Sequence, residues 1–302
     1  MPRLLVICGA TASGKTSLAV DCALKLGTEV ISADSQLVYK GLNIGTAKPD
    51  EAEMRGVPHR MIDVAEPTQN FSVFDYASGA IPHVERLLGQ GKVPVICGGT
   101  GFYINSLLFD LSYGNVAADE NIRKKYSELL EKEGKEKLYE LLKGVDSETA
   151  EKLHVNDTKR IIRALEIYEV SGRKKSDQND GLKPVYDYLA VAINYPREEL
   201  YARIDRRVDE MFEKGLVEEV KGLLSSGVDE NCQSMQAIGY KEAINCLKNG
   251  DLHSTMRDII KKNTRHYAKR QITFFKKLPN LVWLEPNEAT SDKVLELLNE
   301  EQ

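Results

Sequence analysis

A short stretch near the start of the chain has the residue types and spacing of a phosphate-binding loop. Gly9 and Gly14 are followed by Lys15 and Thr16, with an apolar run before them and a helical pattern after them. The glycines let consecutive N–H groups point inward, and the positive end of the following helix adds to their attraction for an anion. Lys15 supplies a point charge, and the Thr16 hydroxyl is placed to bind Mg²⁺. The motif predicts a site for a di- or triphosphate group, formed by Gly9, Ala10, Thr11, Ala12, Ser13, Gly14, Lys15 and Thr16.

Two further polar side chains follow apolar runs that we predict to be strands. Asp34 follows residues 29–32, and Thr100 follows residues 93–97 within a Gly-Gly-Thr-Gly sequence. An aspartate here could hold the water shell of Mg²⁺ or act as a general base, although aspartate before serine also commonly caps a turn. Thr100 can donate a hydrogen bond to a phosphate oxygen. Many phosphate-loop NTPases have a Mg²⁺-binding aspartate where this chain has Gly-Gly-Thr, so the usual equipment for splitting a nucleotide is incomplete.

Basic residues gather in two other parts of the chain. Lys159, Arg160 and Arg163 share one side of a predicted helix. Residues 257–277 contain eight basic residues and one acidic residue, with histidine, tyrosine and phenylalanine between them. This mixture suits a nucleic-acid backbone and unstacked bases, and the alternative is a solvated helix face. The basic residues of this second stretch are Arg257, Lys261, Lys262, Arg265, Lys269, Arg270, Lys276 and Lys277.

The composition is that of an ordinary globular protein. Of 302 residues, 42% are hydrophobic and 29% are charged, and the net charge of −5 gives no overall sign of nucleic-acid binding. The five cysteines are odd in number and form no C-x-x-C pair, which favours a reduced protein over disulfides or a zinc site. We find neither a segment apolar enough to span a membrane nor a signal-peptide pattern, and therefore expect a cytoplasmic location.

Strand-like runs alternate with helical patterns along most of the chain. We expect strands at residues 4–8, 29–32, 60–64, 93–97, 188–193 and 281–284. In the helix predicted between residues 73 and 88, the apolar face would contain Phe74, Ala77, Ile81, Val84 and Leu88. Alternating strands and helices predict a parallel sheet with helices on both faces, in the manner of P-loop NTPases. The phosphate loop, Asp34 and Thr100 would then meet at the carboxyl edge of this sheet.

Residues 115–184 contain no strand pattern: the pattern is helical to about residue 171, and the polar residues 173–183 predict a loop. We interpret them as an all-helical insertion into an α/β core formed by residues 1–114 and 185–302. Later helices are predicted from residue 200, from about residue 236, and as a last helix over residues 252–277. On the first of these, Arg203 and Arg207 lie opposite the apolar face, where they could face water or close over a phosphate.

Five short sequences together make the chain resemble the tRNA dimethylallyltransferase, or isopentenyl-tRNA transferase, family of the bacterial type. They are the phosphate loop, Ile-Ser-Ala-Asp-Ser-Gln at 31–36, Gly-Thr-Ala-Lys-Pro at 45–49, Gly-Gly-Thr-Gly-Phe-Tyr at 98–103 and Ile-Gly-Tyr-Lys-Glu at 238–242. Ala-Lys-Arg-Gln at 268–271 also fits the family. One departure is Ala10, where the family usually has proline, and the zinc-finger extension of eukaryotic members is missing.

The resemblance implies transfer of a dimethylallyl group from its pyrophosphate to N6 of the adenosine on the 3′ side of the tRNA anticodon. The phosphate loop would hold the pyrophosphate with Mg²⁺, helped by Lys15 and Arg203. Asp34 would act as the general base, and Thr100 would contact substrate at the reaction centre. The enzyme would act as a monomer on the anticodon stem-loop. The residues implied to contact tRNA are Asp34, Ser35, Gln36, Leu37, Thr100, Arg123, Lys159, Arg160, Ile161, Ile162, Arg163, Lys269 and Arg270.

Two other functions remain open on the sequence. One is prenyl transfer to free AMP, ADP or ATP, as in the related adenylate isopentenyltransferases. The other is a P-loop small-molecule kinase, or a nucleotide-dependent RNA-binding module without transfer chemistry. The basic, aromatic helix over residues 252–277 and the helical insertion favour tRNA as the acceptor. The missing Mg²⁺-binding aspartate argues against the kinase.

Overall fold

The computed structural model describes residues 3–111, 119–177 and 183–300. The chain divides into two compact units, an α/β unit of Met1–Leu108 with Pro184–Gln302 and a helical unit of Phe109–Lys183. The boundary that we expected at residues 114 and 115 lies outside the described residues.

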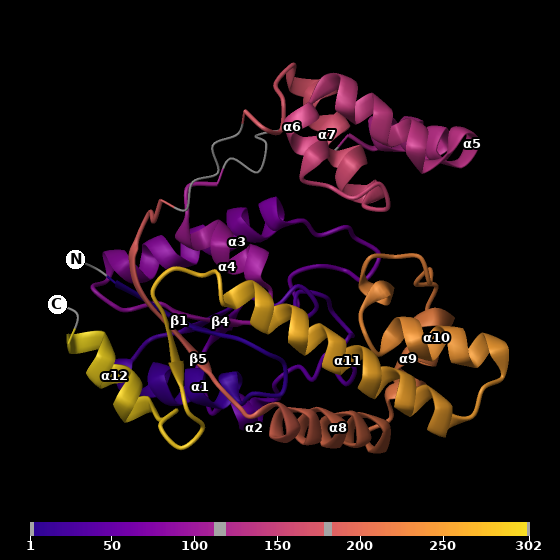
Figure 1. Ribbon diagram of the computed structural model, residues 1–302. Coiled ribbons are helices and arrows are strands. Elements are labelled where there is room, and N and C mark those ends of the chain that lie inside the picture. Colours follow the sequence, from indigo (N-terminus) through magenta and orange to yellow (C-terminus); the bar gives the residue numbers. More distant parts are fainter. Residues whose placement is uncertain (1–2, 112–118, 178–182, 301–302) are drawn as a thin grey trace. The chain divides into compact units, whose positions relative to one another are not determined.

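The described residues of the α/β unit form a six-stranded sheet in the order β3-β2-β4-β1-β5-β6, and every described strand pair is parallel. This confirms the predicted fold class. Figure 1 labels its central strands β1, β4 and β5. All residues of β1 and β4 are buried, as expected for strands covered on both faces. The strands are β1 (Arg3–Cys8), β2 (Val30–Ser32), β3 (His59–Arg60), β4 (Val95–Gly98), β5 (Asp187–Ile193) and β6 (Leu281–Leu284).

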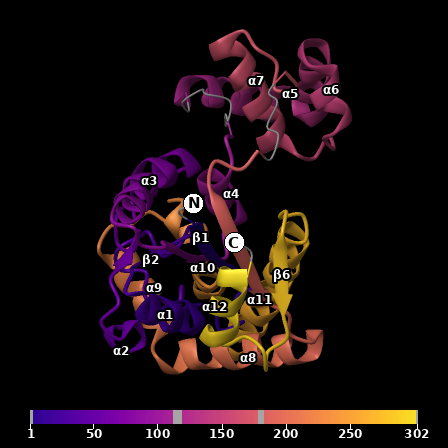
Figure 2. The ribbon, with the colours of Figure 1, turned by 90° about the vertical axis from the view of Figure 1, so that its left-hand side faces the viewer.

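Helices cover both faces of the sheet (Figure 2). On one side, α1 (Lys15–Leu26) and α12 (Ser291–Glu300) pack in a single apolar cluster with alternate residues of β1, β4 and β5. On the other side, α3 (Val73–Gly89) and α4 (Gly101–Leu108) are joined by stacked rings of Tyr76 and Tyr103, whose centroids are 4.0 Å apart. The other α-helices described in this unit are α2 (Glu51–Met54), α8 (Arg197–Glu213), α9 (Leu216–Ser225), α10 (Tyr240–Asn249) and α11 (His253–Phe275), and a short 3₁₀ helix spans Ser234–Gln236.

The helical unit contains α5 (Glu120–Val145), α6 (Ser147–Glu151) and α7 (Thr158–Ser171). Its core is formed by buried leucines of α5 and by Ile161 and Leu165 of α7. The long helix α5 is interrupted at Gly134, whose φ of 84° and ψ of 170° are not helical. Glycine adopts this conformation without the steric cost that a side chain would add.

The strand predicted at residues 60–64 is wrong beyond Arg60. Only His59 and Arg60 pair with β2, and Met61 and Asp63 have φ of 63° and 56°. These two left-handed residues turn the chain so that the amides of Asp63 and Val64 donate to carbonyls at residues 37 and 38. Beyond Arg60, the backbone of this run therefore bonds to the loop at residues 37 and 38 instead of extending the sheet.

The predicted apolar face of α3 is also wrong in phase. Phe74 is 70% exposed and Ile81 is 37% exposed, whereas Tyr76, Ala80 and Leu87 are buried. Only Val84 belongs to both the predicted and the observed stripe. In addition, the helix predicted over residues 252–277 is not the last one, because α12 follows it.

Candidate active site

The phosphate loop connects β1 to α1, and its backbone has the conformation that an anion site requires. Gly9 and Gly14 have φ of 122° and 86°, and Ala12 also has a positive φ of 61°. Gly14 is the N-cap of α1, and having no side chain it cannot cap the amides of the first turn. These amides, together with the positive end of the helix, favour a bound anion.

Lys15 folds back over this loop, and its Nζ donates to the carbonyl of Ala10. Burial lowers the pKa of Lys15, and the positive charge of Arg207 lowers it further. Cys97 and Asp34 raise this pKa, but they do not outweigh burial. A bound phosphate would reverse the effect of burial, because a nearby negative charge favours the protonated amine.

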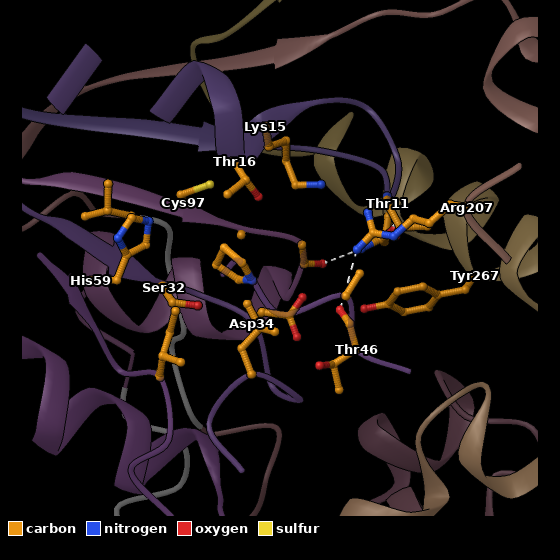
Figure 3. A pocket seen from close by; sticks show the side chains of 18 residues that line it. Thr11, Lys15, Thr16, Ser32, Asp34, Thr46, His59, Cys97, Arg207 and Tyr267 are labelled. Carbon is orange, nitrogen blue, oxygen red and sulfur yellow. Dashed lines mark hydrogen bonds between the residues drawn. The ribbon is translucent and has the colours of Figure 1, made fainter. Parts of the chain in front are cut away.

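A cavity opens beside the loop at the carboxyl edge of the sheet (Figure 3). Polar side chains from several parts of the chain point into it: the phosphate loop, the ends of β2 and β4, the loop at Thr46, His59 of β3, α8 and α11. Its lining includes Thr11, Lys15, Thr16, Ser32, Asp34, Thr46, Cys97, Gly98, Gly99, Arg207, Tyr267 and Gln271. An apolar part of the wall is formed by Val30, Leu37, Ala47, Pro49 and Ile62. The cavity thus joins an anion site to an apolar surface.

Asp34 and Thr100 lie at this edge, although they are far apart in the sequence. Thr100 Oγ1 accepts a hydrogen bond from the Ser35 amide at 2.9 Å and donates to Ser35 Oγ at 3.3 Å. Asp34 Oδ1 accepts from the Gln36 amide at 2.9 Å, so this carboxylate caps its own turn and also lines the cavity. The structure therefore brings the two residues together through Ser35.

Gln271 of α11 ties the phosphate loop to the loop after β4. Its Oε1 accepts from the Thr11 amide at 2.8 Å, and its Nε2 donates to the Gly99 carbonyl at 2.9 Å. The residue is 5% exposed, and a Cβ added at Gly99 would lie 2.2 Å from Nε2. A Cβ at Gly98 would lie 2.1 Å from the Ala33 carbonyl oxygen. A side chain at position 99 would therefore collide with Gln271, and one at position 98 would collide with the backbone of Ala33.

The two arginines of α8 have different positions. Arg203 Nε donates to the Ala12 carbonyl at 2.8 Å, and its guanidinium lies over the Tyr195 ring at 4.5 Å. Arg203 is not among the described residues that line the cavity, whereas Arg207 is. Arg207 Nη2 donates to the Thr46 carbonyl at 3.5 Å; burial lowers the pKa of Arg207, and the charge of Asp34 opposes this. Arg203 supports the loop, and Arg207 faces the cavity.

Tyr267 of α11 also lines the cavity, and sequence reasoning missed both it and Gln271 as site residues. Burial raises the pKa of Tyr267, and so does the charge of Asp34. One feature of the sequence could have identified Gln271. It is a polar residue one turn of helix from the apolar residues Ala268 and Phe275, and both of these are buried. Such a residue on a buried stripe is normally held by specific partners.

The basic residues of α11 separate into two faces. Lys261 pairs with Asp209 of α8 at 2.7 Å, and Arg265 pairs with Asp205 at 2.7 Å. Lys269 and Arg270 are exposed, and they border a surface hollow further along the helix. This hollow is lined by His266, Lys269, Arg270, Thr273, Phe274 and Lys277. The inward residues therefore stabilise the fold, and the outer face carries the available charge.

In the helical unit, a fully buried glutamate organises two of the predicted RNA contacts. Glu166 accepts from Arg123 Nε at 2.9 Å and from Arg163 Nη1 at 2.6 Å. Lys159 and Arg160 are exposed on α7. Ile161 is 0% exposed, so any contribution of this residue to RNA binding acts through the position of the helix. Ile162 is half-buried against the same core.

The residues present fit Mg²⁺ bound together with a phosphate ligand. Thr16 contributes an exposed hydroxyl at the cavity, and no group of three or more His, Cys, Asp or Glu side chains suited to a metal occurs in the described part of the chain. Mg²⁺ usually keeps several waters and binds few protein ligands beside substrate phosphates. Among the described helices, none is long and apolar enough to cross a membrane.

Comparison with known proteins identifies the family. The model of the IPP transferase family matches residues 37–278. A tRNA dimethylallyltransferase of Acetivibrio thermocellus is 42% identical over 97% of this chain and 95% of its own. One from Caldanaerobacter subterraneus subsp. tengcongensis is 45% identical over 93% and 91%.

Solved structures agree with this result. The full-length tRNA isopentenylpyrophosphate transferase of Bacillus halodurans has a TM-score of 0.74 and 37% identity, covering 100% of this chain and 96% of its own. A eukaryotic dimethylallyltransferase acting on tRNA has a TM-score of 0.80 and 28% identity, covering 100% of this chain and 77% of its own. With the family match over most of its length, and relatives this similar along the whole fold, the chain belongs to the IPP transferase family.

Proposed function

We propose that this chain transfers a dimethylallyl group from dimethylallyl pyrophosphate to N6 of the adenosine on the 3′ side of the tRNA anticodon. The observation that carries the proposal is a single cavity that joins a phosphate loop to Asp34, with glycines and Thr100 in place of a Mg²⁺-binding aspartate after β4. That combination suits a pyrophosphate leaving group better than the splitting of a nucleotide. The curated relatives bear the name of this activity.

On the donor side, the proposed role of the phosphate loop is to hold pyrophosphate while its bond to the allylic carbon breaks. Gly9, Ala10, Thr11, Ala12, Ser13, Gly14, Lys15 and Thr16 form this loop. As the bond breaks, negative charge grows on the leaving oxygen, and fixed amides with Lys15 and Arg207 stabilise it. Arg203 acts through the loop that it supports. Mg²⁺, held by Thr16, would neutralise charge on the pyrophosphate.

On the acceptor side, the adenine N6 attacks the allylic carbon, and the Asp34 carboxylate takes the proton that N6 loses. The C–O bond to pyrophosphate breaks, a C–N bond forms, and the proton passes to Asp34, so the reaction balances. The base must leave the anticodon stack to reach the cavity. Ser35, Gln36 and Leu37 would border it, with Thr100 fixing Ser35.

We assign tRNA binding to exposed basic residues on two helices. On α11 these are Lys269 and Arg270, beside the aromatic ring of Phe274 in the surface hollow. In the helical unit they are Lys159 and Arg160, with Arg123 and Arg163 fixed by Glu166 and with Ile161 and Ile162 supporting α7. All proposed donor-site residues come from one chain. We propose that the enzyme acts as a monomer in the cytoplasm.

Incubation with radiolabelled dimethylallyl pyrophosphate and Mg²⁺ tests the proposal, with tRNA in one reaction and AMP in the other. Label in tRNA alone is the expected result. Label in AMP would instead support an adenylate isopentenyltransferase. Label in neither acceptor would reject prenyl transfer and return the kinase to consideration.

A further inference from the structure

Two sequence motifs outside the reaction chemistry meet at one carboxylate. Glu219 of α9 accepts hydrogen bonds from the backbone amides of Asn43, Ile44 and Gly45 at 3.0, 2.8 and 3.1 Å. The hydroxyl of Tyr240, from the motif at residues 238–242, donates to the same carboxylate. Glu219 thus holds the start of the loop that contains the motif at residues 45–49. A carboxylate suits this position because it offers acceptor sites only.

The backbone of this loop also packs directly on a buried ring. Tyr240 is 0% exposed, and a Cβ added at Gly45 would lie 2.5 Å from its Cε2 and 2.9 Å from Leu216 Cδ1. Burial raises the pKa of Tyr240, and the Glu219 charge raises it further, so the hydroxyl remains a donor at neutral pH. Charge-assisted hydrogen bonds and packing therefore fix the same few backbone atoms.

The fixed loop leads straight to the cavity. Thr46 and Ala47 line the cavity wall, and the Thr46 carbonyl accepts from Arg207 Nη2 at 3.5 Å. Thr46 Oγ1 donates to the Leu42 carbonyl at 2.7 Å, and Lys48 Nζ donates to the Tyr39 carbonyl at 2.8 Å. These bonds make the Thr46 carbonyl a defined support for a guanidinium. Figure 3 shows Arg207 beside Thr11, with Tyr267 and Thr46 on the same side of the cavity.

We propose that Glu219, together with Tyr240, is a positioning residue that holds Arg207 in place against the pyrophosphate group of the donor. This inference rests on the proposed function, because it assumes a pyrophosphate in the cavity. Glu219 acts through the loop at residues 43–46 and does not itself touch the substrate. Small displacements of such supporting groups reduce both binding and rate, since the charge must lie where the leaving group forms.

Binding of inorganic pyrophosphate with Mg²⁺, measured by titration calorimetry on the full chain, gives a readout that needs no transfer. Glu219→Gln offers one acceptor oxygen in place of two and turns an amide group toward backbone donors. We expect it to weaken pyrophosphate binding about tenfold, as for coupled neighbours. Tyr240→Phe removes one donor only, and we expect a smaller loss in the same direction. The matched control is Glu218→Gln, an exposed neighbour on the same helix, which should bind like the wild type.

A double-mutant cycle with Arg207→Gln separates positioning from a general loss of stability. If Glu219 acts through Arg207, adding Glu219→Gln to the Arg207→Gln variant should weaken pyrophosphate binding by less than about twofold. Equal losses in both backgrounds would overturn the proposal, and so would normal affinity in Glu219→Gln. Thermal unfolding of each variant shows that the folded protein is being compared.

Steady-state kinetics provide a second test of the role of Glu219. Together with the binding data, they distinguish a failure of this inference from a failure of the proposed function. We expect Glu219→Gln to raise the KM for the prenyl donor while the KM for tRNA stays unchanged. A rise in the tRNA KM alone would overturn the inference. A wild-type chain that binds pyrophosphate but labels no acceptor would reject the proposed function, and the binding cycle would still decide the role of Glu219. A wild-type chain that does not bind pyrophosphate would reject both.

Discussion

The donor cavity and the proposed RNA-binding surfaces use basic side chains in opposite ways. In the cavity, Lys15 and Arg207 are half-buried and each donates to a backbone carbonyl. On α11 and α7, Lys269, Arg270 and Lys159 are exposed. A fixed charge in a partly enclosed site acts strongly over a short range, whereas an exposed charge is screened by salt. Recognition of pyrophosphate should therefore depend on geometry, and recognition of RNA on ionic strength.

The largest expected effect comes from Asp34→Asn. The amide cannot take the N6 proton, so the transfer rate should fall about 10²–10⁴-fold. Binding of tRNA should change little, because the carboxylate adds no favourable charge for RNA. Single-turnover transfer and filter binding on the same preparation measure the two quantities. Full activity in this variant would remove Asp34 as the base.

Gln271→Ala tests whether the cavity is built in advance. The change leaves the Thr11 amide and the Gly99 carbonyl without their partner. Each unsatisfied buried group costs about 1–3 kcal/mol, so urea unfolding should show a loss of at least about 2 kcal/mol. Pyrophosphate binding should weaken as well. Thr273→Ala, at an exposed position on the same helix, is the control. Normal stability would mean that the two loops are held by other contacts.

Acid unfolding tests whether the buried carboxylate of Asp146 stabilises the helical unit through its hydrogen bonds. Burial alone would raise the pKa of Asp146, but hydrogen bonds from Thr149 and Ser176 lower it from 3.8 to about 2. A depressed folded pKa contributes stability that is present above about pH 4 and is lost as the pH falls towards 2. The contribution is about 2 kcal/mol. Asp146→Asn should flatten this part of the pH profile. An unchanged profile would contradict the assignment.

The smallest effect is expected from Lys269→Ala combined with Arg270→Ala. Loss of two exposed charges should weaken tRNA binding and reduce the slope of log affinity against log salt by about 1–2. The control is Lys261→Ala combined with Arg265→Ala on the inward face of the same helix. These residues pair with Asp209 and Asp205, so their loss should reduce stability and leave the salt slope unchanged. Equal slopes in both double variants would remove the distinction between the two faces.

Local patterns were enough to predict the parallel sheet and the meeting of the phosphate loop, Asp34 and Thr100 at one edge. These patterns gave wrong or incomplete predictions where the phase of a helix or a distant contact decides which residues are buried and which face the cavity. Phe74 and Ile81 are apolar yet exposed, because α3 buries a stripe displaced by about one residue. Arg203 and Arg207 are one helical turn apart, and no local signal tells which supports the loop and which faces the cavity. Gln271 stands out locally as a polar residue on a buried helix stripe, but the sequence does not tell that its partners are Thr11 and Gly99.

The bridge made by Gln271 also bears on how the protein is synthesised. It joins Thr11 to a helix that is translated some 260 residues later. Strand β1 and the phosphate loop are synthesised before α11, so the cavity lacks one wall until α11 has been made. A chain that ends before α11 therefore has no complete donor site, so activity should appear only after α11 has been translated.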